Sequence, residues 1–137
     1  KTKDKQGNDR NIITGKNPKM NRKYDLEERL INFAREAIDV SEGLPDSFAG
    51  KHIAQQLVRS STSPALNYGE AQAAESRNDF IHKMKVCLKE LRETYNYLRL
   101  IQKKSWYQEE KLSMHQKENN ELIAIFVSSV KTALKKK

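Results

Sequence analysis

The stretch RSSTSPALNYGEAQAAESRNDFIHKMKVCLKEL, residues 59–91, decides the fold because helical periodicity continues on both sides of a proline. The apolar stripe that holds Leu57 before the proline and Leu66 after it keeps one phase, which predicts a helix that is kinked at Pro64 but not broken there. The serine and threonine hydroxyls just before the proline can bond to the backbone carbonyls that its ring leaves free. Gly69, in the same helix, is expected to let another backbone approach closely.

Apolar residues at steps of three and four mark three further helical segments. We expect helices over residues 25–42 and 48–75, a third from Ser76 through Ile101, and a fourth that begins at Ser105 or Ser113. Capping signals support the starts: Asp25 with Glu28 resembles a capping box, either Asp46 or Ser47 caps the second helix, and Ser76 with Asp79 opens the third.

Four long helices with short connections predict an all-α, up-and-down antiparallel four-helix bundle that occupies residues 25–137 as one domain. Ile125 and Val127 lie outside the apolar stripe of the last helix, so that helix presents more apolar surface than one chain needs to bury. No apolar run is long enough to cross a bilayer, and the single cysteine suits a reducing compartment. We therefore expect a cytoplasmic protein that makes no contact with membrane.

The formal charge of +8 is concentrated in the first 24 residues, which hold eight Lys or Arg and two Asp. The remaining residues hold 18 Lys or Arg and 16 Asp or Glu, a net charge of +2. The segment 1–24 is polar and lacks apolar periodicity, so it is predicted to be a disordered basic tail. It is either a solvated leader or an arm that contacts phosphates.

The residues do not form a recognisable catalytic or metal-binding motif. Among His52, His82 and His115, only His82 has a carboxylate three residues earlier, and an inward-facing pair of such motifs is what a metal site in a bundle requires. Cys87 lies on the apolar stripe of the third helix, which favours a core thiol over a nucleophile. We therefore expect neither enzymatic activity nor a cofactor.

Two polar patterns remain as candidate functional surfaces. The first is a line on the second helix at steps of four, four and three, formed by Arg59, Ser63, Asn67 and Glu70. Arg59 and Glu70 are about 16 Å apart at the helical rise, so their partners must come from another helix or subunit. The line either fixes the register of an assembly or is an ordinary half-exposed flank.

The second pattern is a basic row about 27 Å long on the third helix. Its members are spaced at steps of four and three and point away from the apolar stripe: Lys85, Lys89, Arg92, Asn96, Arg99 and Lys103. Such a row can follow the phosphates of a nucleic acid, with salt-dependent affinity. It can equally be a solvated face paired with glutamates of a neighbouring helix.

The segments RSSTS, NYGEA, AESRNDFIHKMK and KELRET together resemble the signature of the 23S rRNA intervening-sequence proteins, and NNELIAIFVSSVKTALKK resembles the last helix of that family. The similarity spans residues 25–135. It implies a small antiparallel four-helix bundle that assembles into a homopentamer. A related branch of the family serves as the accessory variability determinant of diversity-generating retroelements, where it associates with a reverse transcriptase and nucleic acid.

Carried onto this chain, the resemblance assigns Arg59, Asn67, Tyr68 and Glu70 to the motif of the second helix, and Asp79, Phe80 and Lys85 to the start of the third. The family supplies no catalytic residues. The net charge of +2 over residues 25–137 is lower than that of the retroelement accessories, which weakens the case for nucleic acid. We expect a homopentamer that binds RNA or DNA through Lys85, Lys89, Arg92, Arg99 and Lys103; the alternative is a protein-interaction scaffold without nucleic acid.

Overall fold

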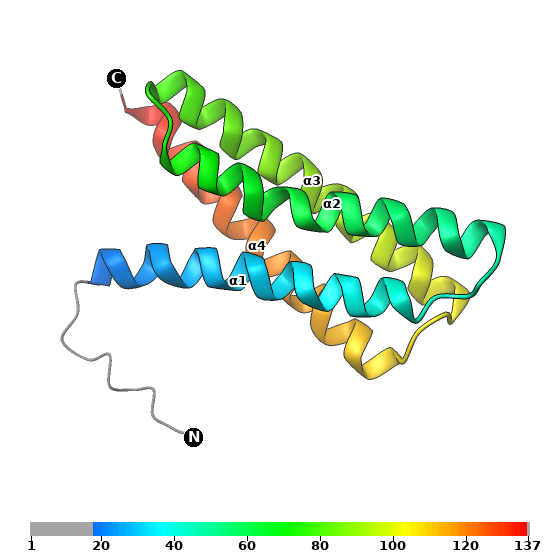
Figure 1. Ribbon diagram of the computed structural model, residues 1–137. Helices are drawn as coiled ribbons and strands as arrows, with labels where there is room; N and C mark the ends of the chain where they lie inside the picture. Colours follow the sequence, from blue (N-terminus) through cyan, green and yellow to red (C-terminus); the bar gives the residue numbers. More distant parts are fainter. Residues whose placement is uncertain (1–17, 137) are drawn as a thin grey trace.

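The computed structural model describes residues 18–136, with side chains from Asp25 onward, and this range consists of four α-helices (Figure 1). The helices are α1 (Pro18–Glu42), α2 (Phe48–Gln72), α3 (Arg77–Lys104) and α4 (Glu109–Lys135). Within the described range, none is long and apolar enough to span a bilayer. The expected tail lies largely outside this range, since residues 1–17 are not described.

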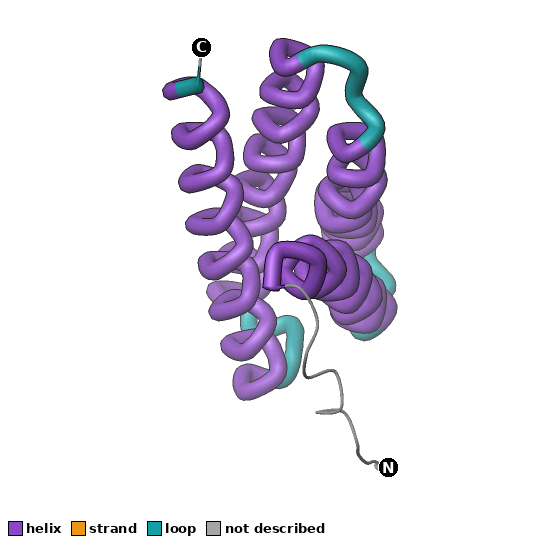
Figure 2. Tube along the Cα trace, turned by 90° about the vertical axis from the view of Figure 1, so that its left-hand side faces the viewer, coloured by secondary structure: helices purple, strands orange, loops and turns teal. Residues whose placement is uncertain are grey.

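Helices adjacent in sequence pack against each other, and α1 also contacts α4, which closes the cycle of four. The predicted all-α, up-and-down antiparallel bundle is thereby confirmed. The backbones of the two diagonal pairs, α1 with α3 and α2 with α4, do not approach each other closely, and their side chains meet only in the core. Figure 2 shows α4, which carries the C-terminus, on the opposite side of α3 from α2. Each helix therefore forms one corner of the bundle.

The core residues recur at alternating steps of three and four in every helix, which is the spacing of left-handed coiled-coil packing. In α3 the buried series is Met84, Cys87, Leu91, Thr94, Leu98 and Ile101. Two apolar clusters fill the interior: one is centred on Phe33, Leu91 and Phe126, and the other on Leu57, Leu98 and Leu112.

A buried polar layer separates the two clusters. Ser60 of α2 and Thr94 of α3 bond through their hydroxyls at 2.7 Å, and the amide nitrogen of Asn119 in α4 donates to the carbonyl of Leu91 at 3.2 Å. His115 lies one turn from Asn119, stacked on Phe33 with 4.4 Å between ring centroids. Three helices thus exchange hydrogen bonds at the same height of the bundle.

Helix α2 continues through Pro64 without a break, as the phase of its sequence predicted. Hydroxyls of the preceding turn bond to backbone carbonyls, with Thr62 donating to Val58 at 2.8 Å and Ser60 to Leu57 at 3.4 Å, but these are not the Ser60 carbonyl that the proline leaves free. The thiol of Cys87 contacts the Pro64 carbonyl at 3.5 Å. The turn around the proline is therefore held by side chains from both α2 and α3.

Several local predictions are wrong. Helix α1 begins at Pro18, a residue suited to the first helical position, so Asp25 lies inside the helix and does not cap it. A Cβ at Gly69 would meet nothing within 4 Å, so no other helix among the described residues approaches that glycine. Leu66 is 69% exposed, because buried Ser61, Pro64 and Tyr68 occupy the core positions of that turn.

The helix caps give a mixed outcome. Ser47 caps α2 by accepting from Gly50 N, and Ser76 caps α3 by accepting from Asp79 N, as expected. Helix α4 begins at Glu109 without a side-chain cap, so neither Ser105 nor Ser113 starts it. Ser105 instead ends α3 in the left-handed conformation, at φ 56°.

The thiol of Cys87 should be inert in the folded protein. Its side chain is fully buried, and burial raises the thiol pKa to about 12, so the reactive thiolate is scarce at pH 8. We expect alkylation by iodoacetamide at pH 8 to be at least about 100-fold slower in buffer than in urea. Mass spectrometry measures the extent of labelling. Rapid and complete labelling of the folded chain would contradict the burial of Cys87.

His115 should make the bundle less stable in mild acid. Burial lowers its pKa, and the hydrogen bond and charge of Glu36 offset this only in part. As pH falls below the ordinary value of 6.5, the unfolded chain binds a proton that the folded chain binds less readily, so the free energy of unfolding decreases. Urea unfolding between pH 7.5 and 5 should show this loss, up to about 1.4 kcal/mol per pH unit.

The variant H115Q should flatten that pH dependence, and the matched variant H82Q should leave it intact because His82 is exposed. Equal pH profiles for H115Q and the unaltered chain would show that His115 is not the group responsible.

Candidate nucleic-acid interface

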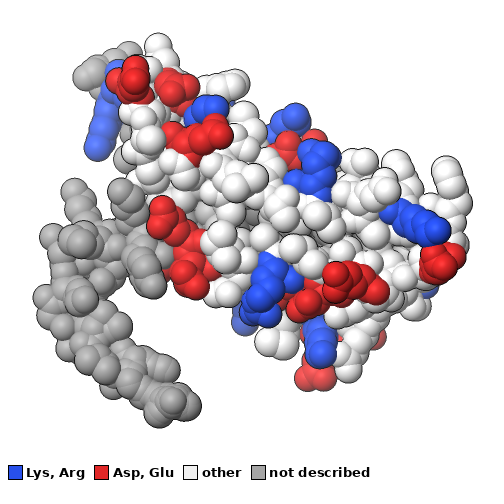
Figure 3. All heavy atoms as spheres, in the orientation of Figure 1, with Lys and Arg blue, Asp and Glu red and all other residues white. Residues whose placement is uncertain are grey.

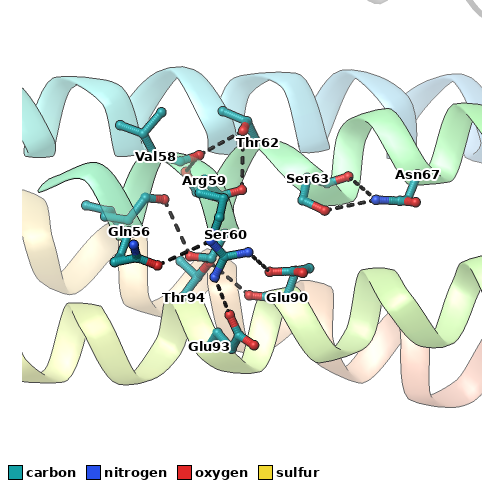
Figure 4. Close-up of polar contacts among 12 residues, drawn as sticks. Gln56, Val58, Arg59, Ser60, Thr62, Ser63, Asn67, Glu90, Glu93 and Thr94 are labelled. Atoms are coloured by element: carbon teal, nitrogen blue, oxygen red, sulfur yellow. Dashed lines mark hydrogen bonds and ion pairs between the residues drawn. The ribbon is translucent and has the colours of Figure 1, made fainter. Parts of the chain in front are cut away.

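The polar line of α2 lies on the seam between α2 and α3 of the same chain (Figure 4). Arg59 bonds to Glu90 at 2.9 Å and to Glu93 at 2.6 Å, so one guanidinium bridges two carboxylates on successive turns of α3. Glu70 pairs with Lys83 of α3 at 2.6 Å. Both charged residues of the line therefore find partners on the neighbouring helix, as the spacing required.

The other members of this motif serve the helix itself or the core. Asn67 donates to the carbonyl and the hydroxyl of Ser63, at 3.0 and 2.9 Å. Tyr68 is buried and meets Phe126 edge to face, with 6.0 Å between centroids; burial raises the pKa of its phenol. These contacts hold α2 in place against α3 and α4.

The ion pairs of Arg59 raise its guanidinium pKa, with the hydrogen bond to Glu93 as the largest cause and that to Glu90 next. Glu90 is only 7% exposed, so its carboxylate depends on this partner for compensation. The seam between α1 and α4 has a similar device, in which Arg29 contacts Glu118 at 2.7 Å and Glu121 at 3.0 Å.

The basic row of α3 has a different environment. All five of its cations are exposed, together with Asn96: Lys85, Lys89, Arg92, Arg99 and Lys103. None of the five takes part in the ion pairs found among the described side chains. The only charge-related contact of the row is that of Arg99, which lies 6.0 Å from the ring centroid of Tyr95.

The carboxylates that could neutralise this row are turned elsewhere. Glu90 and Glu93 of α3 face Arg59, which leaves the outward positions of the helix to lysine and arginine. We call these outward cations, with Asn96, the basic strip. By its geometry the strip can bind a row of phosphates, because its charges are solvated, aligned and free of partners within the described chain.

The net charge differs strongly between helices. Helix α3 holds eight Lys or Arg and three Asp or Glu, a net charge of +5, whereas α1 from Asp25 onward holds two and six, a net charge of −4. The face seen in Figure 3 carries acidic and basic side chains interleaved, without a field of one sign. The small net charge of the bundle thus conceals one basic corner and one acidic corner.

Sequence reasoning missed the buried members of the polar layer. His115 and Asn119 are both almost fully buried, and each has one side-chain atom, Nε2 and Oδ1 respectively, without a partner among the described residues. The signal was present, since the two residues lie in step with Leu112 and Leu122 at intervals of three and four. Because both residues are polar, a search for apolar stripes did not find them.

Two hollows of the described surface lie along the seam between α1 and α4, and another lies where Arg77 and Phe80 of α3 meet the end of α4. One, of about 450 Å³, is lined by Glu36, Asp39, Tyr107 and His115, among others. Within residues 18–136, no three His, Cys, Asp or Glu side chains cluster closely enough to share a metal ion. None of these hollows is lined by a residue of the basic strip.

Residues 22–128 match the family described as 23S rRNA-intervening sequence protein. Among solved structures, the chain is similar to a protein of unknown function from the S23 ribosomal protein family of Bacteroides thetaiotaomicron VPI-5482, with 27% identity and a TM-score of 0.72. The similarity covers 77% of this chain and 98% of that one. A comparison with curated proteins finds no match. The descriptions of the family and of the solved structure name no enzymatic activity.

Replacing Arg59 by glutamine should destabilise the bundle, because it leaves the buried Glu90 without its cation. Since Arg59 is itself half-exposed, we expect a loss of about 1 to 2 kcal/mol in the free energy of unfolding. Urea denaturation followed by circular dichroism measures it.

The control is R35Q, which removes an exposed arginine that meets Asp39 only at 3.9 Å and should cost less than about 0.5 kcal/mol. If R59Q and R35Q lost the same free energy of unfolding, the ion pairs of Arg59 would stabilise the bundle no more than an exposed surface pair does.

Proposed function

This chain belongs to the family of 23S rRNA-intervening sequence proteins, and from that premise we propose that it is a non-enzymatic homopentamer that binds RNA or DNA through the basic strip of α3. Binding is to the phosphate backbone, without strong preference for sequence, and the protein serves as an accessory to a nucleic-acid enzyme such as a reverse transcriptase. Assembly repeats the strip on every copy.

One observation carries the proposal: five exposed cations, none of them in an ion pair among the described side chains, follow one side of α3 with no exposed carboxylate between them. Arg29 and Arg59 each contact two carboxylates, and Lys83 contacts one. A solvated face of ordinary composition would intersperse carboxylates among its lysines and arginines. Here the exposed residues of α3 from Lys85 to Lys103 are five cations, Asn96, Leu100 and Gln102, with no carboxylate among them.

The strip lacks exposed aromatic residues on which bases could stack. Tyr95, below Arg99, is only partly exposed, and the exposed side chains from Lys85 to Lys103 are charged or amide groups apart from the aliphatic Leu100. Base stacking is the usual means by which single-stranded nucleic acids are held by their bases. The chemistry of the strip therefore favours contact with phosphates, whose counterions are released on binding.

Multivalency can give these weak phosphate contacts a high combined affinity for nucleic acid. A single strip that contacts a few phosphates binds weakly at physiological salt, whereas several strips on one ring act on the same strand with a high effective concentration. The proposed oligomer and the proposed ligand thus support each other.

The triple variant K89Q/R92Q/R99Q tests the strip. Its affinity for a generic 30-nucleotide RNA at 50 mM salt should fall at least about tenfold, and the slope of log K against log salt should decrease by about 2 for each strip in contact. Fluorescence anisotropy across a salt titration gives both quantities, and circular dichroism checks that the helix content is unchanged.

The matched control is K111Q/K117Q/K131Q, which removes the same charge from exposed positions of α4. Its binding should stay within about twofold of the unaltered chain. If both triple variants lose affinity equally, net charge and not the strip governs binding. If the unaltered chain fails to bind RNA and DNA even at 50 mM salt, the protein is a scaffold without a nucleic-acid role.

A further inference from the structure

Exposed aromatic side chains are missing from the basic strip. The two tyrosines between Lys85 and Lys103 are only partly exposed. Phe48, which is 91% exposed, is the first residue of α2, and the partly exposed Trp106 follows the end of α3 with the ammonium of Lys104 5.6 Å from its ring centroid. Proteins that hold single strands stack successive bases on aromatic side chains along a basic groove. The strip offers the charges of such a groove without its stacking surface.

The cations of the strip are held on a rigid line. Helix α3 runs unbroken from Arg77 to Lys104 and contains neither proline nor glycine. Steps of three and four residues separate neighbouring positions of the strip by about 4.5 to 6 Å along the helix axis. Because α3 packs against both α2 and α4, it keeps its position when a ligand binds. The ligand must therefore adapt to the strip, and not the strip to the ligand.

A single strand and a double helix differ in what this adaptation costs. A single strand is flexible, so ordering its phosphates along a fixed line of charges costs conformational entropy. A double helix is stiff over about 50 nm, and its phosphates are in place before binding. With no stacking surface on the strip, a single strand gains nothing from its bases to offset the cost of ordering.

Charge density favours the same form of nucleic acid. Double-stranded DNA carries one negative charge per about 1.7 Å of its axis, and each phosphate contact changes the logarithm of affinity by about 0.9 per tenfold change in salt, against about 0.7 on a single strand. The five cations of the strip form no ion pair among the described side chains. A surface that binds by charge alone therefore binds the denser polyanion more tightly.

From these observations we infer that the basic strip selects double-stranded nucleic acid, RNA or DNA, over single strands. This inference rests on the proposed function and names the class of nucleic acid bound at the same site. In a double helix the bases are paired in the interior, so the lack of aromatic side chains on the strip costs nothing. The phosphates of the duplex are the groups that the strip contacts.

The first experiment compares a 30-nucleotide RNA strand that does not pair with itself and the duplex that it forms with its complement. Fluorescence anisotropy at 50 mM salt should show the duplex bound at least about tenfold more tightly, whereas its doubled number of phosphates alone accounts for about twofold. For each strip that contacts five phosphates, the slope of log K against log salt should be about −4.5 on the duplex and about −3.5 on the single strand. A DNA strand and its duplex should give the same order.

A second experiment adds the missing stacking surface. N96W places an indole at an exposed position in the middle of the strip, and the matched variant S113W places one at an exposed position of α4. N96W should raise the affinity for the single strand at least about fivefold, because bases can stack on the indole, and should leave duplex affinity within about twofold. S113W should change neither affinity. Circular dichroism checks that both variants keep their helix content.

The contrary outcomes separate this inference from the proposed function. If the unaltered chain binds neither form, the strip has no nucleic-acid role and the proposed function fails. If it binds the single strand as tightly as the duplex, or more tightly, the proposed function stands and the selection of duplex is wrong. The inference is also overturned if K89Q/R92Q/R99Q keeps the full preference for duplex, or if N96W fails to strengthen binding of the single strand.

Discussion

The buried polar layer is the constraint on which the rest of the structure depends. Apolar side chains at heptad spacing would pack almost equally well if a helix shifted by one turn, but Ser60, Thr94 and Asn119 reach their hydrogen-bond partners at only one shift. An unpaired hydroxyl or amide in this interior would cost about 1 to 3 kcal/mol. The layer therefore fixes the relative height of α2, α3 and α4, and all surface arrangements follow from that height.

The fixed register also determines which charged side chains lie on the outer surface of each helix. With α2 held against α3, Arg59 lies level with Glu90 and Glu93 and withdraws both carboxylates from the outer side of α3. The outward positions of that helix are left to lysine and arginine, whereas α1 collects the acidic residues. The basic strip is thus a consequence of internal pairing, since the same helix with its glutamates turned outward would present a mixed surface.

Much of the fold was predictable because apolar periodicity reports helix faces directly. The class, the number of helices, two of the caps and the continuity of α2 through Pro64 followed from the spacing and identity of side chains. The errors about the core share one cause, which is polar residues at core positions: the inferred stripe was extended onto Leu66, and His115 with Asn119 were passed over. The errors about the starts of α1 and α4 concern helix ends, where capping residues were misassigned. The positions of the strip were predictable from the helical angle, but its lack of partners was not, because pairing depends on how far neighbouring helices slide. The expectation for Gly69 was wrong because the sequence does not indicate which helix positions face open space.

The opposite charges of α1 and α3 affect how the molecule orients while it diffuses towards a ligand. With residues 25–42 of α1 at a net charge of −4 and α3 at +5 on opposed corners, these two segments form an electric dipole directed across the bundle. In the field of a polyanion this dipole exerts a torque that turns α3 forward and α1 away during diffusion. The chain thus presents one side on arrival even though its net charge is small, and added electrolyte weakens this alignment over a distance of about 8 to 10 Å.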